Sequence, residues 1–395
     1  MEGVSVRDEA RELNGEMVSW RRHIHLHPEV GFDVGDTAAF VVERLKEARA
    51  EEVRTGVGKS GVTAMIRGAR PGHTLALRAD MDALPVTEET GLPFASAHPG
   101  RMHACGHDAH TAMLLGAAVL LGRHREDLQG AVKLIFQPAE EIGMGAMAMI
   151  QDGVLEDVDA IAGLHTGSLW NGADAGEIGF KSGAVMAAAD VFTIEVSGKG
   201  GHGAQPDRSV DPISIACQVY ATLQTVISRE TPPLDPAVLT VGSFQAGSAP
   251  NVIPDSCTMK GTIRSLSKET RSSLQDRIRT IAEGVAAAMR GSAQVAFRYG
   301  PPPVVCDPGM TEKLVRAAGA VVGPEHVRPI DEPAMVSEDM AFYMEKVPGV
   351  FFSHPATFGG GLDFPHHHPK FTVNEDVLWT GAGTFAELAL TWQED

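Results

Sequence analysis

Three short apolar runs in the first half of the chain are typical of buried strands, and each is followed by potential metal ligands or residues that would support them. The runs and the residues that follow them are Thr74–Arg78 before Asp80 and Asp82, Ala131–Phe136 before Glu140 and Glu141, and Ala160–Leu164 before His165. Helical patterns lie between the runs, which indicates a layered α/β fold. Because open α/β sheets bind ligands at the carboxyl ends of their strands, we expect these polar side chains to converge.

The pattern changes near residue 188 and changes back after residue 300. Residues 188–300 follow the order β-α-β-β-α-β, which matches the ferredoxin-like split motif. Gly300 is followed by three prolines, a composition typical of a stiff linker. We therefore predict a discontinuous larger domain of residues 1–187 and 301–395 and an inserted α+β domain of residues 188–300. Within the larger domain, Asp36–Glu47 predicts an amphipathic helix that Asp36 caps.

Charge and cysteine content exclude several classes of function. The chain carries 33 Lys and Arg against 51 Asp and Glu, a net charge of −18, which disfavours nucleic acid and anionic lipid as partners. Its four cysteines are widely spread and form no disulfide framework. The first residues lack an apolar signal segment, and the longest apolar run, 111–122, is too short to span a bilayer. We expect a cytoplasmic protein with a small-molecule substrate.

A second set of metal-binding side chains lies on predicted loops. Cys105 and His107 stand two residues apart just before a predicted helix, and three consecutive histidines begin at His366. Thiolate and imidazole ligands suit zinc and similar divalent ions. Taken alone, a Cys-x-His pair is more often incidental, and paired acids such as Glu140 and Glu141 are more often a solvated turn. Their common position at the end of one predicted sheet favours a metal site.

The number of candidate ligands favours two ions. They are Cys105, His107, Glu141, His165 and one late histidine, for which spacing leaves His367 and His368 open. Five protein ligands exceed the three typical of a single catalytic zinc, so two ions that share a ligand fit better. Glu140 is then left over as a general base for a water held between the ions.

Nine stretches of the chain, in order, resemble the M20 metallopeptidase family in its amidohydrolase branch, which includes aminoacylases, hippurate hydrolases and auxin-conjugate hydrolases. The stretches are Arg21–Glu29, Arg78–Pro85, Met102–His110, Gln137–Glu141, Gly200–Pro206, Ala249–Pro254, Gly261–Arg264, Ser337–Asp339 and His367–Pro369. The resemblance implies an aminopeptidase-like α/β catalytic domain with a central mixed sheet and an inserted lid and dimerisation domain. It implies His367 as the late ligand and Glu140 as the base.

Four further residues receive roles as hypotheses. Asp82 is expected to orient a ligating histidine, although an acid in a turn is the simpler interpretation. Spacing alone favours an exposed turn for His202, whereas the resemblance implies that it reaches the active site of a neighbouring subunit and stabilises the oxyanion. Asn251 and Arg264 are candidate ligands for a substrate carboxylate, and the alternative for Arg264 is a surface ion pair.

Together these features predict a homodimeric enzyme that hydrolyses the amide bond of N-acyl amino acids with two divalent ions, either Zn, Mn, Co or Ni. A metallo-dipeptidase or aminopeptidase on the same scaffold, or a metal-binding paralogue without catalysis, is the alternative. The chain departs from the family after His165 and at Met340, where Phe is common. The preferred acyl group and amino acid therefore stay open.

Overall fold

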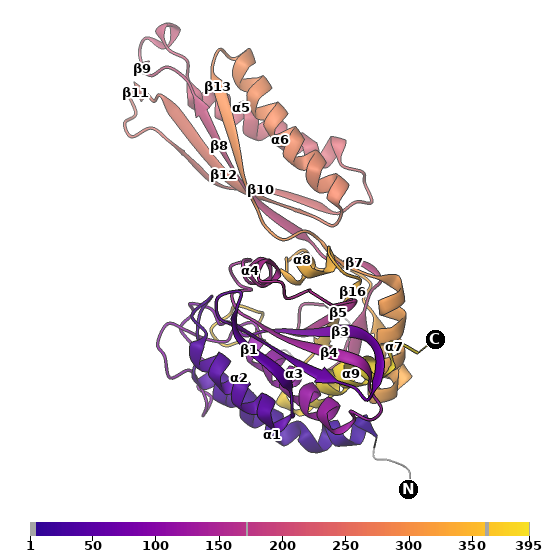
Figure 1. The fold of residues 1–395 in the computed structure, drawn as a ribbon. Helices are drawn as coiled ribbons and strands as arrows, with labels where there is room; N and C mark the ends of the chain where they lie inside the picture. The colour runs from indigo at the N-terminus through magenta and orange to yellow at the C-terminus, as the bar shows by residue number, and fades with distance from the viewer. Residues whose placement is uncertain (1–4, 171–172, 360–362, 395) are drawn as a thin grey trace. The chain divides into compact units, whose positions relative to one another are not determined.

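The computed structural model describes residues 5–170, 173–359 and 363–394. Contacts divide the chain into two compact units (Figure 1). The larger unit comprises Met1–Val185, Val305–Ala334 and Asp339–Asp395, and the smaller comprises Met186–Val304 and Met335–Glu338. The expected boundaries after residues 187 and 300 differ slightly from these, and the expectation did not include the Met335–Glu338 segment in the smaller unit. Within the described chain, no helix is both long and apolar enough to cross a membrane.

The larger unit is built on an eight-stranded mixed sheet of order β1-β2-β4-β3-β5-β16-β6-β15. The strands are β1 Glu51–Val57, β2 Gly61–Arg67, β3 Arg70–Asp80, β4 Gln129–Gln137, β5 Ala160–Gly167, β6 Ile178–Phe180, β15 Val327–Pro329 and β16 Gly349–Pro355. The centre of the sheet, β4-β3-β5-β16, is parallel, whereas β1 and β2 are antiparallel to their neighbours. The α/β fold with a mixed sheet is thus confirmed.

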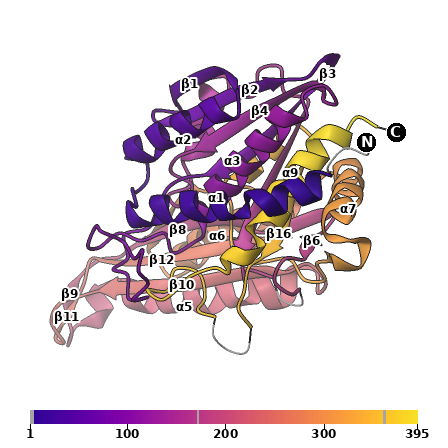
Figure 2. The ribbon, with the colours of Figure 1, turned by 90° about the horizontal axis from the view of Figure 1, so that it is seen from below.

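Helices cover both faces of this sheet: the longer ones lie together on one face (Figure 2), and two short ones lie on the other (Figure 1). They are α1 Val6–Leu26, α2 Gly35–Glu47, α3 His107–Arg123, α4 Gly145–Gln151, α7 Pro308–Val322, α8 Met340–Met344 and α9 Leu378–Thr391, with short 3₁₀ turns at Pro324–His326 and Glu375–Val377. The helix α3 packs against both α1 and α9 as well as β3, so nearly all of its side chains are buried. The start of α3 contacts the end of β3 and the strand β5 through His110, which lies 2.6 Å from Asp80 and 2.8 Å from the backbone nitrogen of Thr166.

The start of α2 differs from the expectation. The helix begins at Gly35. The side chain of its N-cap residue, Val34, makes no capping hydrogen bond with the described residues. The carboxylate of Glu29 instead accepts hydrogen bonds from the backbone N–H of Asp36 and of Thr37, at 3.2 and 2.8 Å. The predicted Asp36 cap is wrong because an acid six residues before the first turn of α2 satisfies its free amides.

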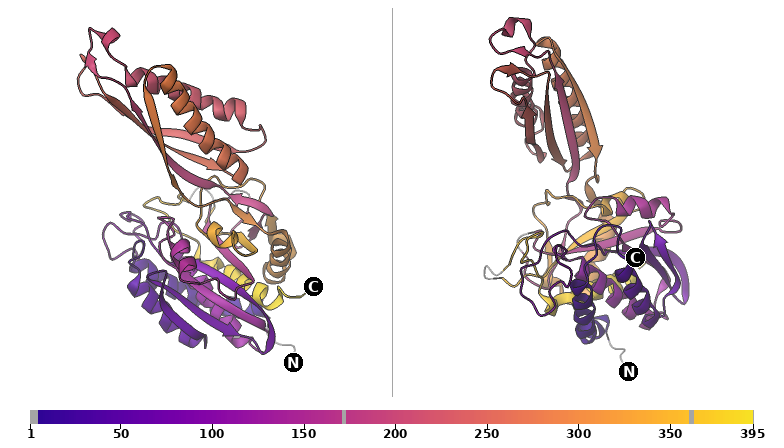
Figure 3. Two further views of the ribbon diagram at one scale, coloured as in Figure 1. Left: turned by 45° about the horizontal axis from the view of Figure 1, so that its top comes forward. Right: turned by 90° about the vertical axis from the view of Figure 1, so that its left-hand side faces the viewer.

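The smaller unit is a four-stranded antiparallel sheet, of order β10-β12-β8-β13, with two helices on one face (Figure 3). Its elements are β8 Ala188–Ser197, α5 Pro212–Thr225, a π turn Val226–Glu230, β10 Ala237–Ala246, β12 Ser256–Ser265, α6 Lys268–Ala288 and β13 Ser292–Tyr299, with the short pair β9 Gly201–His202 and β11 Val252–Ile253 and a 3₁₀ turn at Pro206–Arg208. This is the predicted β-α-β-β-α-β order. Alternate residues of β8, including Phe192 and Ile194, are buried in an apolar core with α5 and α6. A separate ribbon pairs β7 Gly183–Met186 with β14 Val304–Cys306.

Candidate metal centre

The candidate ligands come from four places in the larger unit. Cys105 and His107 flank Gly106 at the start of α3, Glu141 follows β4, His165 lies in β5, and His367 lies between β16 and α9. Gly106 has a φ of +95°, and a Cβ there would come 2.5 Å from the side chain of Thr166. Only glycine fits this close approach, which turns the chain so that Cys105 and His107 face the same space.

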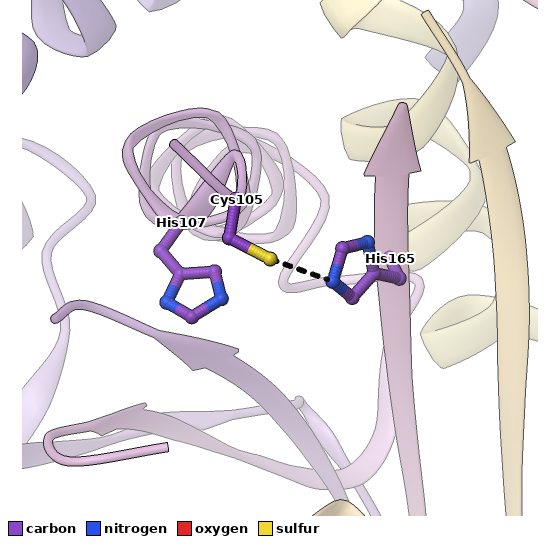
Figure 4. Close-up of side chains that lie close together, drawn as sticks. All are labelled: Cys105, His107 and His165. Atoms are coloured by element: carbon purple, nitrogen blue, oxygen red, sulfur yellow. Dashed lines mark hydrogen bonds between the residues drawn. The ribbon is translucent and has the colours of Figure 1, made fainter. Parts of the chain in front are cut away.

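The donor atoms of these residues form two overlapping groups. One consists of Cys105, His107 and His165, all buried, and the other of Cys105, Glu141 and His367; within each group the atoms lie within 4.8 Å of one another. Figure 4 shows the first group, in which the Cys105 sulfur lies 3.5 Å from Nε2 of His165. In the second, Nε2 of His367 lies 3.4 Å from a Glu141 oxygen. Cys105 belongs to both groups, as a ligand shared by two ions would.

Both buried imidazoles present the same nitrogen to this space. Nδ1 of His107 lies 2.8 Å from the carbonyl oxygen of Asp82, and Nδ1 of His165 lies 2.9 Å from that of Thr166. Because a carbonyl only accepts hydrogen bonds, each Nδ1 carries the hydrogen and each Nε2 keeps its lone pair for a metal. Nε2 of His107 and Oε1 of Glu141 are buried and lack a hydrogen-bond partner among the described residues. The donor set therefore fits divalent transition-metal ions.

The electrostatics of the cluster point the same way. Burial and the neighbouring Glu141 raise the pKa of the Cys105 thiol well above its ordinary value, and burial raises the pKa of Glu141 to about 7. Burial, with His110 nearby, lowers the pKa of His165, which keeps that imidazole neutral. The buried thiol and carboxyl hold their protons unless positive charge lies beside them, so metal binding and proton release are coupled here.

Asp82 contacts the site differently from the hypothesis made for it. Its carboxylate oxygens accept the backbone N–H groups of Glu140 and Glu141, at 2.9 and 3.2 Å, and the nearest approach to Nδ1 of His107 is 3.6 Å. The hydrogen bond that orients His107 comes from the Asp82 backbone carbonyl instead. The turn thus held brings a Glu140 oxygen within 4.8 Å of donor atoms of His107 and Glu141.

A buried layer of ionic side chains lies behind the ligands, and local sequence patterns do not predict how its members pair. Arg78 donates to Asp80 at 2.7 Å and to Asp339 at 2.8 Å, and Gln137 also donates to Asp339 at 2.8 Å. His110 contacts Asp80 at 2.6 Å. Asp80 and Asp339 lie within stretches that carry the family resemblance, which is the one sequence signal that could have drawn attention to them. Their pairing with Arg78 depends on the fold.

The smaller unit brings His202 and Asn251 together and places Arg264 elsewhere. His202 is exposed and pairs with Val252 across β9 and β11, while the carbonyl of Asn251 accepts the N–H of Gly203 at 2.9 Å. Arg264 is half-buried near the opposite end of β12, eight residues beyond the end that adjoins β11. At a rise of about 3.4 Å per residue, Arg264 lies roughly 27 Å from the end of β12 that adjoins β11. One substrate carboxylate therefore cannot contact both Asn251 and Arg264 of a single chain.

Comparison with known proteins identifies the family. The sequence profile described as Peptidase family M20/M25/M40 matches residues 76–391. The chain belongs to the M20 peptidase family. Its M20 relatives include N-acetyl-L-cysteine deacetylase of Bacillus subtilis (strain 168), which is 44% identical over 368 residues, 93% of this chain and 85% of that protein. N-acyl-L-amino acid amidohydrolase of Geobacillus stearothermophilus is 43% identical over 295 residues, 74% of this chain and 79% of that protein.

Solved structures of M20 proteins share the fold. The crystal structure of the YXEP protein of Bacillus subtilis, titled a dinuclear metal binding peptidase from the M20 family, matches with a TM-score of 0.84 and 37% identity. The match covers 96% of this chain and 98% of that one. An M20 chain with two overlapping donor groups is thus similar along nearly its whole length to a protein with two metal ions.

Proposed function

We propose that this M20 protein hydrolyses the amide bond of N-acyl amino acids and releases a carboxylic acid and a free amino acid. The observation that carries the proposal is the pair of donor groups that share Cys105, with Glu140 beside them. Relatives named N-acetyl-L-cysteine deacetylase and N-acyl-L-amino acid amidohydrolase support an acyl amino acid as the substrate.

Five residues would hold the two ions: Cys105, His107, Glu141, His165 and His367. Thiolate and imidazole donors favour Zn, Co or Ni, and the single carboxylate also admits Mn. Two bound ions would supply Lewis-acid activation of the amide carbonyl and of the attacking water. Cys105 belongs to both donor groups, so its thiolate would be needed for the site to hold both ions.

Glu140 is the residue that we propose for the proton transfers. Its carboxylate oxygen lies near the donor atoms of His107 and Glu141, and the Asp82 carboxylate holds the backbone of the turn. Glu140 would take a proton from the attacking water and deliver it to the departing amine as the amide C–N bond breaks. Asp82 thus positions the base, and its backbone carbonyl orients His107.

Residues of the smaller unit are proposed to bind substrate across a homodimer. His202 is exposed, and its Nδ1 accepts only the N–H of Ala204, at 3.1 Å, among the described residues. Its Nε2 would stabilise the oxyanion in the active site of a second subunit, and Asn251 would accompany it. Arg264 would bind the substrate carboxylate, since its guanidinium donates only to the carbonyl of Ile263 among the hydrogen bonds of the described chain.

The proposal extends to the cell compartment and to partners. The cysteines are free, and the chain carries a net charge of −18. A cytoplasmic location, with no nucleic acid or membrane as a partner, fits both features.

The test is a substrate panel on chelator-stripped protein reloaded with Zn, Mn, Co or Ni, with released amine as the readout. N-acetyl, N-benzoyl and longer N-acyl amino acids are compared with free dipeptides. Turnover of the acyl amino acids, absent before reloading, is the expected result. Faster turnover of dipeptides would assign the dipeptidase activity instead, and inertness toward every compound would indicate a metal-binding protein without catalysis.

A further inference from the structure

His110 is a buried histidine whose two ring nitrogens are both hydrogen-bonded. It lies one turn after His107 on α3. Its Nδ1 is 2.6 Å from a carboxylate oxygen of Asp80 at the end of β3, and its Nε2 is 2.8 Å from the backbone N–H of Thr166 in β5. Because the N–H of Thr166 only donates, Nε2 accepts, and Nδ1 carries the hydrogen that it donates to Asp80. One side chain thus ties together three elements that surround the metal centre.

These hydrogen bonds exclude His110 as a metal ligand. Donor atoms of Asp80, His107 and His110 lie within 4.8 Å of one another, which by distance alone suggests a further metal group. However, Nδ1 of His110 is protonated, and the lone pair of Nε2 is engaged by Thr166. Asp80 also accepts from Arg78 at 2.7 Å. The group is therefore satisfied internally, and the role of His110 is a positional one.

The contacts of His110 lead directly to two proposed ligands. Its ring stacks on that of His107, with centroids 5.4 Å apart, and meets the ring of His165 edge-on at 4.8 Å. Thr166, whose N–H is bound by His110, accepts the Nδ1 hydrogen of His165 on its own carbonyl. The orientation of His165 therefore depends on the placement of Thr166, and that placement depends on Nε2 of His110.

We propose that His110 is a positioning residue that fixes His165 through Thr166 and so sets the affinity of the Cys105, His107 and His165 group for its ion. The inference rests on the proposed function, because it concerns the same metal centre. Residues that hold the ligands of a metal typically change its affinity by about 10- to 100-fold when they are replaced.

Two variants with amide side chains separate the two hydrogen bonds of His110. The amide of Gln reaches the position of Nε2 and can accept from Thr166, whereas the amide of Asn reaches only that of Nδ1 and can contact Asp80. Chelator competition with Zn²⁺ measures affinity in wild type, His110→Gln, His110→Asn and His110→Ala. The absorption band between the Cys105 thiolate and Co²⁺ reports the geometry of the reloaded centre. His354→Gln is the matched control, since His354 is equally buried and contacts Thr166 at its side-chain oxygen, 2.9 Å from Nδ1, rather than at its N–H. Nε2 of His354 lies 3.0 Å from the Val377 carbonyl and from the Thr380 hydroxyl, so its hydrogen bonds lead away from the metal centre.

We expect His110→Gln and the control to bind Zn²⁺ within about threefold of wild type, and His110→Asn to bind about 10-fold or more weakly with an altered Co²⁺ band. Circular dichroism confirms that each variant is folded, and the Gln and Asn pair carries the test if His110→Ala unfolds. The inference would be overturned if His110→Gln and His110→Asn bound Zn²⁺ equally well, whether at the wild-type affinity or below it. Either result leaves the proposed function intact if wild type binds two ions and releases amine, whereas an inert wild type would overturn that function itself.

Discussion

The two units of the chain place their functional residues in opposite environments. In the larger unit, Cys105, His107 and His165 are buried, and each of the two imidazoles donates from Nδ1 to a backbone carbonyl. In the smaller unit the core is an ordinary apolar one, and His202 lies exposed on a two-residue strand. The metal centre is thus assembled from segments of the larger unit alone. The exposed side chain of His202 is instead open to groups outside the smaller unit.

Replacing the proposed base tests the larger unit most strongly. Glu140→Gln removes the proton acceptor but leaves the Asp82 contact to the backbone of the turn. We expect kcat for an N-acyl amino acid to fall by about 10²- to 10⁴-fold, the usual contribution of general base catalysis, with two metal ions still bound. Steady-state kinetics and metal analysis of the same sample check this. Unchanged turnover would remove Glu140 from the mechanism.

Replacing His202 tests whether an exposed residue of the smaller unit takes part in the chemistry. His202→Ala is expected to lower kcat by about 10²- to 10³-fold with little change in KM, because an oxyanion donor acts mainly in the transition state. Metal content and folding should match wild type, since the side chain is exposed. The exposed His73 provides a matched control, and His73→Ala should leave kcat unaltered. If both variants behave alike, His202 is an ordinary surface histidine.

Mixing subunits sharpens the same comparison. Glu140→Gln and His202→Ala variants, each nearly inactive alone, should regain up to about a quarter of wild-type activity when their subunits are mixed and exchanged. The reason is that one of the two sites in a mixed dimer then has both an intact base and an intact histidine. No recovery after verified subunit exchange would indicate that His202 acts within its own chain or not at all.

Arg264 is expected to have the smallest effect, on binding alone. Arg264→Ala should raise KM for carboxylated substrates by about 10- to 100-fold, as expected for charged hydrogen bonds worth roughly 1.5–3 kcal/mol, with kcat nearly constant. Substrates whose carboxylate is replaced by an amide provide the comparison. An equal rise in KM for the amides would mean that the substitution disturbs the smaller unit rather than a carboxylate contact.

Local patterns of the sequence were enough for the architecture. The apolar runs before Asp80, Glu140 and His165 became the parallel strands β3, β4 and β5, because buried parallel strands need continuous apolar residues. The β-α-β-β-α-β order of the smaller unit was likewise predicted from the spacing of its apolar residues, which alternates between the patterns of strands and helices. Glycine and proline marked its exit near residue 300.

Contacts between distant segments could not be predicted in this way. Arg78 and Gln137 both pair with Asp339, which lies 261 and 202 residues further along the chain. No local pattern encodes such pairings, because each depends on how whole elements pack. The distance between Asn251 and Arg264 could not be predicted for a related reason. Only the register of β12 shows that the residues between them run along the length of the sheet.

The central claim is that two ions would be held by donor groups that have Cys105 in common, and metal content measured against activity tests it most directly. Chelator-stripped protein is titrated with Zn²⁺ while bound metal per chain and amine release are followed together. The account predicts two equivalents per chain, with activity reaching its maximum only as the second binds, and loss of the second equivalent in Cys105→Ala. Full activity at one equivalent or none, or two tightly bound ions in Cys105→Ala, would contradict it.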